Sequence, residues 1–157
     1  MEVEDGERRI RLAGRIDRVD LIRDTHAALV IDYKRSARPL RSRVDQGLEF
    51  QLPIYLLAVR RLLGLDGVAA ELRILREPKK GEGLYLEEAK GPLGLGRKSV
   101  YTREEWETLL SVTEERIRRV TRRMEEGDIS IRSKSCAHCS FDAVCRFEKW
   151  RQPYTRG

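Results

Sequence analysis

One apolar stretch that ends in charged residues, AALVIDYK at residues 27–34, decides the fold. Its aliphatic and β-branched residues predict a strand from Ala27 to Tyr33. Side chains alternate along a strand, so Asp32 and Lys34 project from one face and Tyr33 from the other. A carboxylate and an ammonium group are therefore expected side by side at the end of this strand.

Two shorter strands are predicted upstream, at Ile10 to Leu12 and at Ile16 to Ile22, separated by turn-forming and polar residues. If the second of these pairs antiparallel with the strand at 27–33, Asp17 can lie opposite Asp32. One cation could then bridge both carboxylates, with an ammonium group in reach to support the developing charge on a phosphate. The alternative is a solvated Asp/Lys pair on an exposed strand face, because short motifs also arise by chance.

A polar pair downstream favours the functional interpretation. Apolar residues recur at spacings of three and four from Val44 to Leu63 and predict an amphipathic helix that is broken near Gly47. Gln51 and Tyr55 are four residues apart on this helix and share a face. On their own they could be a helix cap and a core aromatic residue. Their position after the Asp/Lys strand makes a joint site the better interpretation.

Three strings carry a family resemblance: GRIDRVD at 14–20, VIDYKRS at 30–36 and EFQLPIYLLA at 49–58. They resemble the catalytic core of the PD-(D/E)XK nuclease superfamily, and within it the RecB-like nuclease domain that ends AddB-type helicase–nuclease subunits. The resemblance implies an α/β, restriction-endonuclease-like core with a short mixed β-sheet flanked by helices. It also implies a metal-dependent deoxyribonuclease that works as an exonuclease on single-stranded DNA ends, with a helicase, in recombination and double-strand-break repair.

The same resemblance implies a set of catalytic residues, Asp17, Asp32, Lys34, Gln51 and Tyr55. In this set Asp17 and Asp32 bind Mg²⁺ or Mn²⁺, and the main-chain carbonyl of Tyr33 completes the metal shell. Lys34 assists the attacking water, while Gln51 and Tyr55 support the site and the DNA. A family histidine that lies further upstream has no counterpart in this sequence.

Two other charged residues are expected to be structural. Asp20 belongs to the GRIDRVD string but falls on the strand face opposite that of Asp17, so we expect it to form an ion pair with Arg18 or another neighbour. His26 lies in a turn between two strands and is expected at the surface rather than as a metal ligand.

The charge balance of the chain favours an anionic partner. Lys and Arg number 32 against 26 Asp and Glu, which gives a formal net charge of +6. Such an excess is typical of proteins that bind polyanions. Arg35, Arg38 and Arg41 follow the predicted active strand directly and are expected to contact the DNA backbone. A solvated loop beside a helix is an equally good explanation of this run.

All three cysteines, Cys136, Cys139 and Cys145, fall in one short segment. This clustering, in a chain that opens with no secretion signal, indicates metal binding rather than disulfides. The spacing is similar to the C-terminal iron–sulfur motif of AddB-type subunits and CRISPR-adaptation nucleases, which implies a [4Fe–4S] cluster. A zinc site that uses His138 as its fourth ligand is the alternative. A fourth thiolate could also come from a missing upstream part or from a partner chain.

The rest of the chain completes a single expected domain over residues 1–157, a fragment or C-terminal part of a larger protein, with a metal-cluster tail at 128–157. Strands are predicted at Val68 to Leu75 and Gly83 to Glu87. A long helix is predicted to start with a capping box of Thr102 and Glu105 and to end at Gly127.

The sequence lacks the long apolar run that is typical of membrane-spanning proteins. No apolar run of 18 or more residues is present, so we expect no membrane span and a cytoplasmic location. Two rival functions remain open: a nuclease-like module that binds DNA without catalysis, and a CRISPR-adaptation nuclease.

Overall fold

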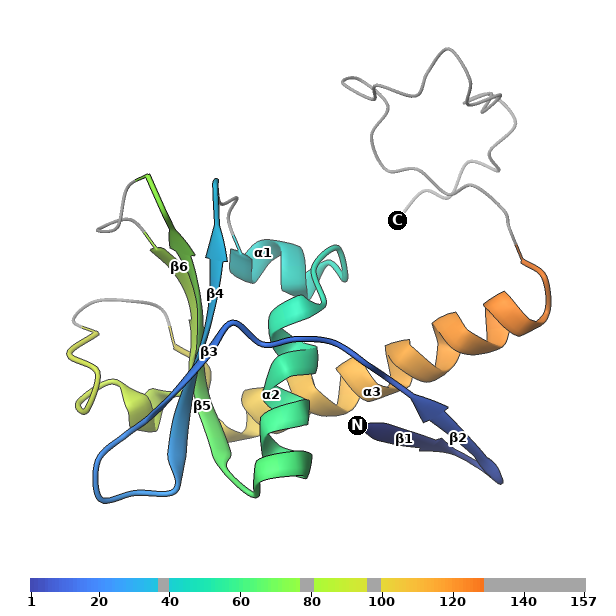
Figure 1. Ribbon diagram of the computed structural model, residues 1–157, viewed down its shortest axis with the longest axis horizontal. Helices are drawn as coiled ribbons and strands as arrows, with labels where there is room; N and C mark the ends of the chain where they lie inside the picture. The colour runs from blue at the N-terminus through green and yellow to red at the C-terminus, as the bar shows by residue number, and fades with distance from the viewer. Residues whose placement is uncertain (37–39, 77–80, 96–99, 129–157) are drawn as a thin grey trace, which may run out of the picture. The chain divides into compact units, whose positions relative to one another are not determined.

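The structure is a computed structural model that describes residues 1–36, 40–76, 81–95 and 100–128 (Figure 1). The chain divides into two compact units, Met1–Thr121 and Arg122–Gly157. The first unit holds the sheets and most of the helices. No helix among the described residues has both the length and the apolar character needed to cross a bilayer.

A four-stranded mixed sheet organises the first unit. Its order is β3 (Arg18–Leu21), β4 (Ala27–Lys34), β5 (Asp66–Ile74) and β6 (Gly81–Tyr85). The central strand β4 pairs antiparallel with β3 and parallel with β5, and β5 pairs antiparallel with β6. The expected mixed sheet with flanking helices is therefore present, and β3 pairs with β4 in the antiparallel manner that the sequence suggested.

Two helices connect the parallel strands. They are α1 (Leu40–Asp45) and α2 (Gln51–Leu63), in place of one continuous helix. Neighbouring parallel strands need such a crossover connection, because a tight turn would bring the chain back in the antiparallel direction. The predicted break near Gly47 is confirmed, since this residue has a φ of 68° between the two helices. Only glycine adopts that conformation at little energetic cost.

A long helix covers the same face of the sheet as α2. This helix, α3 (Arg103–Glu125), follows the short 3₁₀ turn η1 (Glu87–Ala89) and an intervening loop. The capping box is confirmed, because Thr102 and Glu105 exchange hydrogen bonds of 2.8 and 3.2 Å. The fully buried Trp106 indole donates to the carbonyl of Gly67 at 3.1 Å, which fixes α3 to β5.

The main core lies between the sheet and these helices. Its buried side chains come from every layer and include Val30, Leu52, Leu56, Val68, Trp106, Leu110 and Ile117. A smaller apolar cluster on the other sheet face contains Leu29, Ile31, Ala69, Tyr85 and Leu95. Because both faces of β4 are covered, its apolar residues form a continuous run instead of an alternating pattern.

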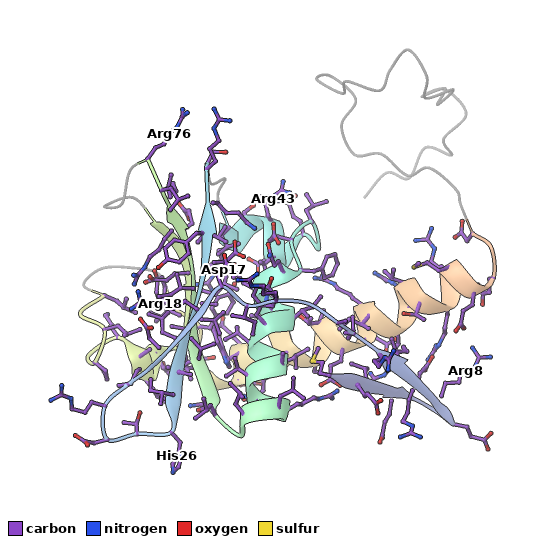
Figure 2. All side chains as sticks on the ribbon, viewed as in Figure 1. Arg8, Asp17, Arg18, His26, Arg43 and Arg76 are labelled. Atoms are coloured by element: carbon purple, nitrogen blue, oxygen red, sulfur yellow. The ribbon has the colours of Figure 1, made fainter. Side chains whose placement is uncertain are left out.

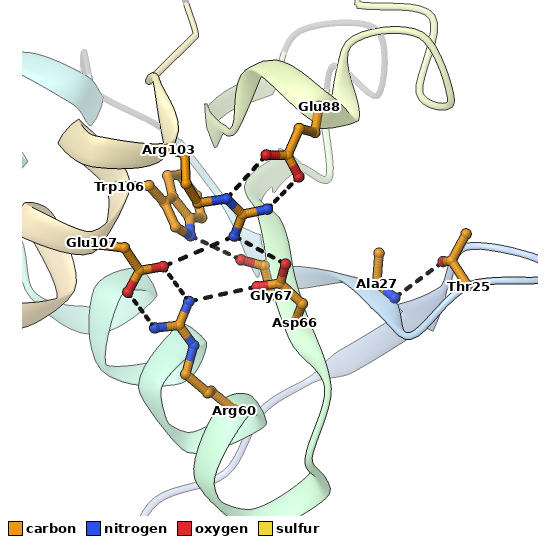
Figure 3. A network of polar contacts seen from close by, with 9 residues as sticks. All are labelled: Thr25, Ala27, Arg60, Asp66, Gly67, Glu88, Arg103, Trp106 and Glu107. Carbon is orange, nitrogen blue, oxygen red and sulfur yellow. Dashed lines mark hydrogen bonds and ion pairs between the residues drawn. The ribbon is translucent and has the colours of Figure 1, made fainter.

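Ion pairs join the start of α3 to its neighbours (Figure 3). Arg103 donates to Asp66 at 3.0 Å and also binds Glu88. Arg60 on α2 donates to Glu107 on α3 at 2.7 Å. The network lies near the beginning of β5, while the residues expected to form the site lie toward the end of β4.

A separate hairpin precedes the main sheet. It consists of β1 (Glu2–Asp5) and β2 (Arg8–Arg11), which pair antiparallel. Val3 anchors the hairpin, because its side chain is fully buried in the main core. The strand predicted at Ile10 to Leu12 overlaps the end of β2, whereas β1 was not predicted.

Candidate functional site

The centre of the candidate site is the pair of charged side chains near the end of β4. Asp32 is only 3% exposed, and the Lys34 side chain is 37% exposed. Lys34 Nζ lies 2.7 Å from Asp32 Oδ2. Both side chains project from the sheet face that α2 covers, as strand alternation predicted. A buried carboxylate next to a single partly exposed cation is thus held where solvent and a substrate can reach the lysine.

The amide of Gln51 joins the two charges. Its Oε1 accepts a hydrogen bond from Lys34 Nζ at 2.8 Å, and its Nε2 donates to Asp32 Oδ1 at 2.9 Å. The same nitrogen donates to the hydroxyl of Tyr55 at 2.9 Å. The two polar ends of one amide therefore fix the orientation of both the carboxylate and the ammonium group.

Tyr55 and Tyr33 connect Asp17 to this group. The Tyr55 hydroxyl donates to the carbonyl of Arg15 at 2.7 Å, two residues before Asp17. Asp17 Oδ2 accepts the backbone N–H of Tyr33 at 3.0 Å. Figure 2 labels Asp17, the residue just before β3. Hydrogen bonds of Gln51 thus join Asp32, Lys34 and Tyr55, and Asp17 binds the backbone of Tyr33, between Asp32 and Lys34. The catalytic roles of these residues remain predictions.

The electrostatics of the pair favour a charged lysine. The Asp32 carboxylate, whose Oδ2 lies 2.7 Å from Lys34 Nζ, raises the pKa of Lys34 above its ordinary value, against the opposing effect of partial burial. The carboxylate of Glu49 also raises it. Lys34 therefore remains an ammonium group at neutral pH and can stabilise negative charge, but it is a poor general base.

The donor set fits a hard divalent cation. Asp32 Oδ2 is buried, and its contact is the 2.7 Å ion pair with Lys34. Carboxylate and carbonyl oxygens are the ligands that Mg²⁺ and Mn²⁺ prefer. Within the described part of the chain, no group of three or more His, Cys, Asp or Glu side chains is arranged to hold a metal. Such an ion would therefore depend on two carboxylates, the main chain and water.

The predicted DNA-binding arginines have different surroundings. Arg35 is exposed directly after β4. Arg41 donates to the carbonyl of Val100 at 3.0 Å and lies 3.9 Å from the ring centroid of Tyr101, so its guanidinium has intramolecular partners. Arg38 lies outside the described residues. Of the two described arginines, Arg35 is the more accessible to a phosphate.

Two predictions for residues outside the site are confirmed. Arg18 donates to both carboxylate oxygens of Asp20, at 2.6 and 2.9 Å, so this acidic residue forms an ion pair and lies outside the site. His26 is exposed, as expected of a surface histidine. The three cysteines, Cys136, Cys139 and Cys145, lie outside the described residues together with His138, and the iron–sulfur and zinc alternatives stay predictions.

Two groups that support the site were not predicted from the sequence, the carboxylate of Glu49 and the carbonyl of Arg15. Glu49 accepts the backbone N–H of Gln51 at 3.1 Å and so caps the start of α2. An acidic residue just before a predicted helix is a signal that could have identified it. The carbonyl of Arg15 has no side-chain signature, because any residue at that position offers the same acceptor.

Comparisons with known proteins match the chain to subunits of helicase–nuclease enzymes. The chain is 28% identical to the exonuclease/helicase subunit RexB of Lactococcus lactis subsp. cremoris (strain MG1363), over 88% of the chain and 16% of the relative. It is 29% identical to an ATP-dependent helicase/deoxyribonuclease subunit of Clostridium botulinum (strain Loch Maree / Type A3), over 94% of the chain and 18% of the relative. The corresponding helicase/deoxyribonuclease subunit of Caldanaerobacter subterraneus subsp. tengcongensis is 29% identical over 88% of the chain and 17% of the relative.

The chain therefore spans about a sixth of the length of the curated relatives that it matches. No solved structure matches it. A family profile described as the PD-(D/E)XK nuclease superfamily matches residues 1–146. Because this match includes β3, β4 and α2 with the whole candidate site, the chain belongs to the PD-(D/E)XK nuclease superfamily.

Proposed function

We propose that this chain is the nuclease module of a helicase-associated enzyme and hydrolyses DNA phosphodiesters with the help of Mg²⁺ or Mn²⁺. One observation supports the proposal above the others. The amide of Gln51 binds Asp32, Lys34 and Tyr55 simultaneously, at 2.8 to 2.9 Å. Such a network orients a carboxylate and a cation toward one point, as a site for phosphoryl chemistry requires.

Asp17, Asp32 and the main-chain carbonyl of Tyr33 would hold the ion. When bound, a divalent metal polarises the scissile phosphate and lowers the pKa of a coordinated water. Lys34, kept protonated by its neighbours, stabilises the negative charge that develops on the phosphate and helps to position the attacking water. Gln51 keeps the lysine aligned with the carboxylate.

The substrate and the partners are inferred from the relatives, whose names describe helicase–exonuclease and helicase–deoxyribonuclease subunits. From these names we infer exonucleolytic cleavage of DNA that a helicase supplies. The single-stranded ends and the role in recombination and double-strand-break repair are proposed from the family resemblance of the sequence. Arg35 provides a sequence-independent contact with the DNA backbone. The cysteines hold a structural [4Fe–4S] cluster in this proposal, with zinc as the alternative.

The test is degradation of end-labelled single-stranded DNA with Mn²⁺ or Mg²⁺. Asp32→Ala removes a carboxylate of the site, and Lys34→Ala removes its cation. We expect each change to lower the rate by roughly 10²-fold or more, the usual effect of removing one group that stabilises a transition state.

Asp20→Ala is the matched control. It removes a carboxylate of the same string whose partner is Arg18 rather than the site. We expect it to keep a rate close to that of the wild type. Wild-type rates in both the Asp32 and the Lys34 variants would refute the proposed function.

A further inference from the structure

The turn between α1 and α2 has a defined backbone geometry. The N–H of Gly47 donates to the carbonyl of Val44 at 2.9 Å, and the N–H of Leu48 donates to the carbonyl of Arg43 at 2.7 Å. This pair of hydrogen bonds, with a left-handed glycine, is the Schellman motif that ends many helices. The turn therefore has one preferred conformation, provided that the last carbonyls of α1 are satisfied.

Arg116 on α3 adds donors to two of those carbonyls, one of which, Val44 O, also accepts the N–H of Gly47. Its guanidinium donates to Val44 O at 3.1 Å and to Asp45 O at 3.4 Å, where a positive charge also complements the helix dipole. The same group lies 5.6 Å from the ring centroid of Phe50. It would lie 3.0 Å from a Cβ at Gly47, so the guanidinium fills the space that glycine leaves.

The turn leads directly into the residue on which the site depends. Gln51 is the first residue of α2, and the preceding Phe50 offers the helix no side-chain cap. The N–H of Gln51 instead binds the carboxylate of Glu49, another residue of the turn. The position of the Gln51 amide is therefore set by the conformation of residues 46–50 as well as by its own helix.

We propose that Arg116 is a positioning residue of the nuclease site. By holding the α1–α2 turn from α3, it places Gln51 so that one amide can bind both Asp32 and Lys34. A displacement of about 1 Å at a positioning group can lower a rate by as much as 10²-fold, so a contact outside the site can control its activity. The inference rests on the proposed function for its effect on catalysis, but the link between Arg116 and Gln51 is measurable without DNA.

The first measurement is the NMR signal of the Gln51 side-chain amide, assigned by its loss in Gln51→Ala. Arg116→Met keeps most of the side-chain length and removes the donors, and we expect it to shift this signal and to speed its hydrogen exchange. Arg118→Met is the matched control, because Arg118 is also on α3 and donates to a backbone carbonyl, that of Glu4, at 2.7 Å. We expect the control to leave the signal unchanged.

If Arg116→Met does not fold, Arg116→Lys is measured in the same way. It keeps the charge but cannot donate to two carbonyls with a planar fork, so the signal should again move. An unmoved Gln51 signal in the folded variant overturns the inference. So does an equal shift in Arg118→Met, which would indicate a general loosening of α3.

The second measurement is a double-mutant cycle on nuclease rate. Arg116→Met should lower the rate about tenfold in the wild-type background and less than about twofold in Gln51→Ala, because residues that act through one another are not additive. Equal factors in both backgrounds contradict the inference. A wild-type chain without nuclease activity contradicts the proposed function instead, and the NMR result then still decides whether Arg116 positions Gln51.

Discussion

Tyr101 carries a titratable hydroxyl into the protein interior, where it is only 5% exposed and donates to Asp45 at 3.3 Å. Burial, and then the charge of Asp45, raise the pKa of Tyr101 to about 12. An unfolded tyrosine ionises near pH 10. Between pH 10 and 12 the unfolded state therefore loses this proton first, and the free energy of unfolding falls as pH rises.

Replacing Tyr101 with Phe removes this titration. We expect the free energy of unfolding to decline less steeply between pH 10 and 12 in the variant, by up to roughly 2 kcal/mol over the interval. Urea unfolding at a series of pH values, followed by circular dichroism, measures the difference. Below pH 9 the two proteins should show parallel pH dependence, and parallel curves up to pH 12 would contradict the assignment.

At the scale of single residues, local rules predicted how side chains face but not what they touch. Alternation along β4 placed Asp32 and Lys34 together, because that rule needs only the strand itself. Arg41 was predicted to bind DNA, yet its guanidinium lies over Tyr101, 60 residues later in the sequence. Such a contact depends on how distant segments pack, which one stretch of sequence does not encode.

At the scale of helices and strands, the start of α3 allows the stabilising effect of the capping box to be tested. Thr102 and Glu105 each accept a hydrogen bond from the other's backbone N–H. Thr102→Ala removes one of these acceptors and should lower the free energy of unfolding by about 1 kcal/mol. Thr108→Ala, on an exposed position in the interior of the same helix, should be neutral or slightly stabilising, because alanine is the better helix former. Chemical denaturation of both variants makes the comparison, and equal losses would contradict a capping role.

The helices were more predictable than the sheet. Spacing, the capping box and Gly127 are all local signals, and they gave α3 nearly its observed limits. The broken helix at 44–63 was predicted from periodicity and one glycine. The first hairpin strand β1 was missed, since its sequence EVED has one apolar residue. The parallel pairing of β4 with β5 was also not predicted, because the partner of a strand is fixed by the crossover rather than by the strand.

At the scale of the whole molecule, metal binding should raise the thermal stability of the folded chain. An ion that binds only the folded chain raises the melting temperature by an amount that grows with its concentration relative to Kd. We therefore expect millimolar Mn²⁺ to raise the melting temperature of the wild type by a few degrees, an effect of about 1 to 3 kcal/mol. Asp17→Ala, which removes one of the two carboxylates, should lose most of that increase.

Differential scanning calorimetry with and without Mn²⁺ measures this effect. The Asp20→Ala variant should respond like the wild type, because its carboxylate is paired with Arg18. If Asp17→Ala were stabilised as much as the wild type, Mn²⁺ would have to bind elsewhere on the chain. The assignment of the ion to the end of β4 would then be wrong.

The crossover between β4 and β5 has a consequence for the order of folding. Asp32 pairs with Leu72, 40 residues later, whereas β3 and β4 are joined by a short turn. Distant pairings form late, because the intervening chain must first lose much of its conformational entropy. Gln51 lies within that intervening chain, so its amide reaches Asp32 and Lys34 only as the crossover closes. By this reasoning, a chain whose crossover has not yet closed would lack the aligned carboxylate and lysine that the proposed nuclease needs.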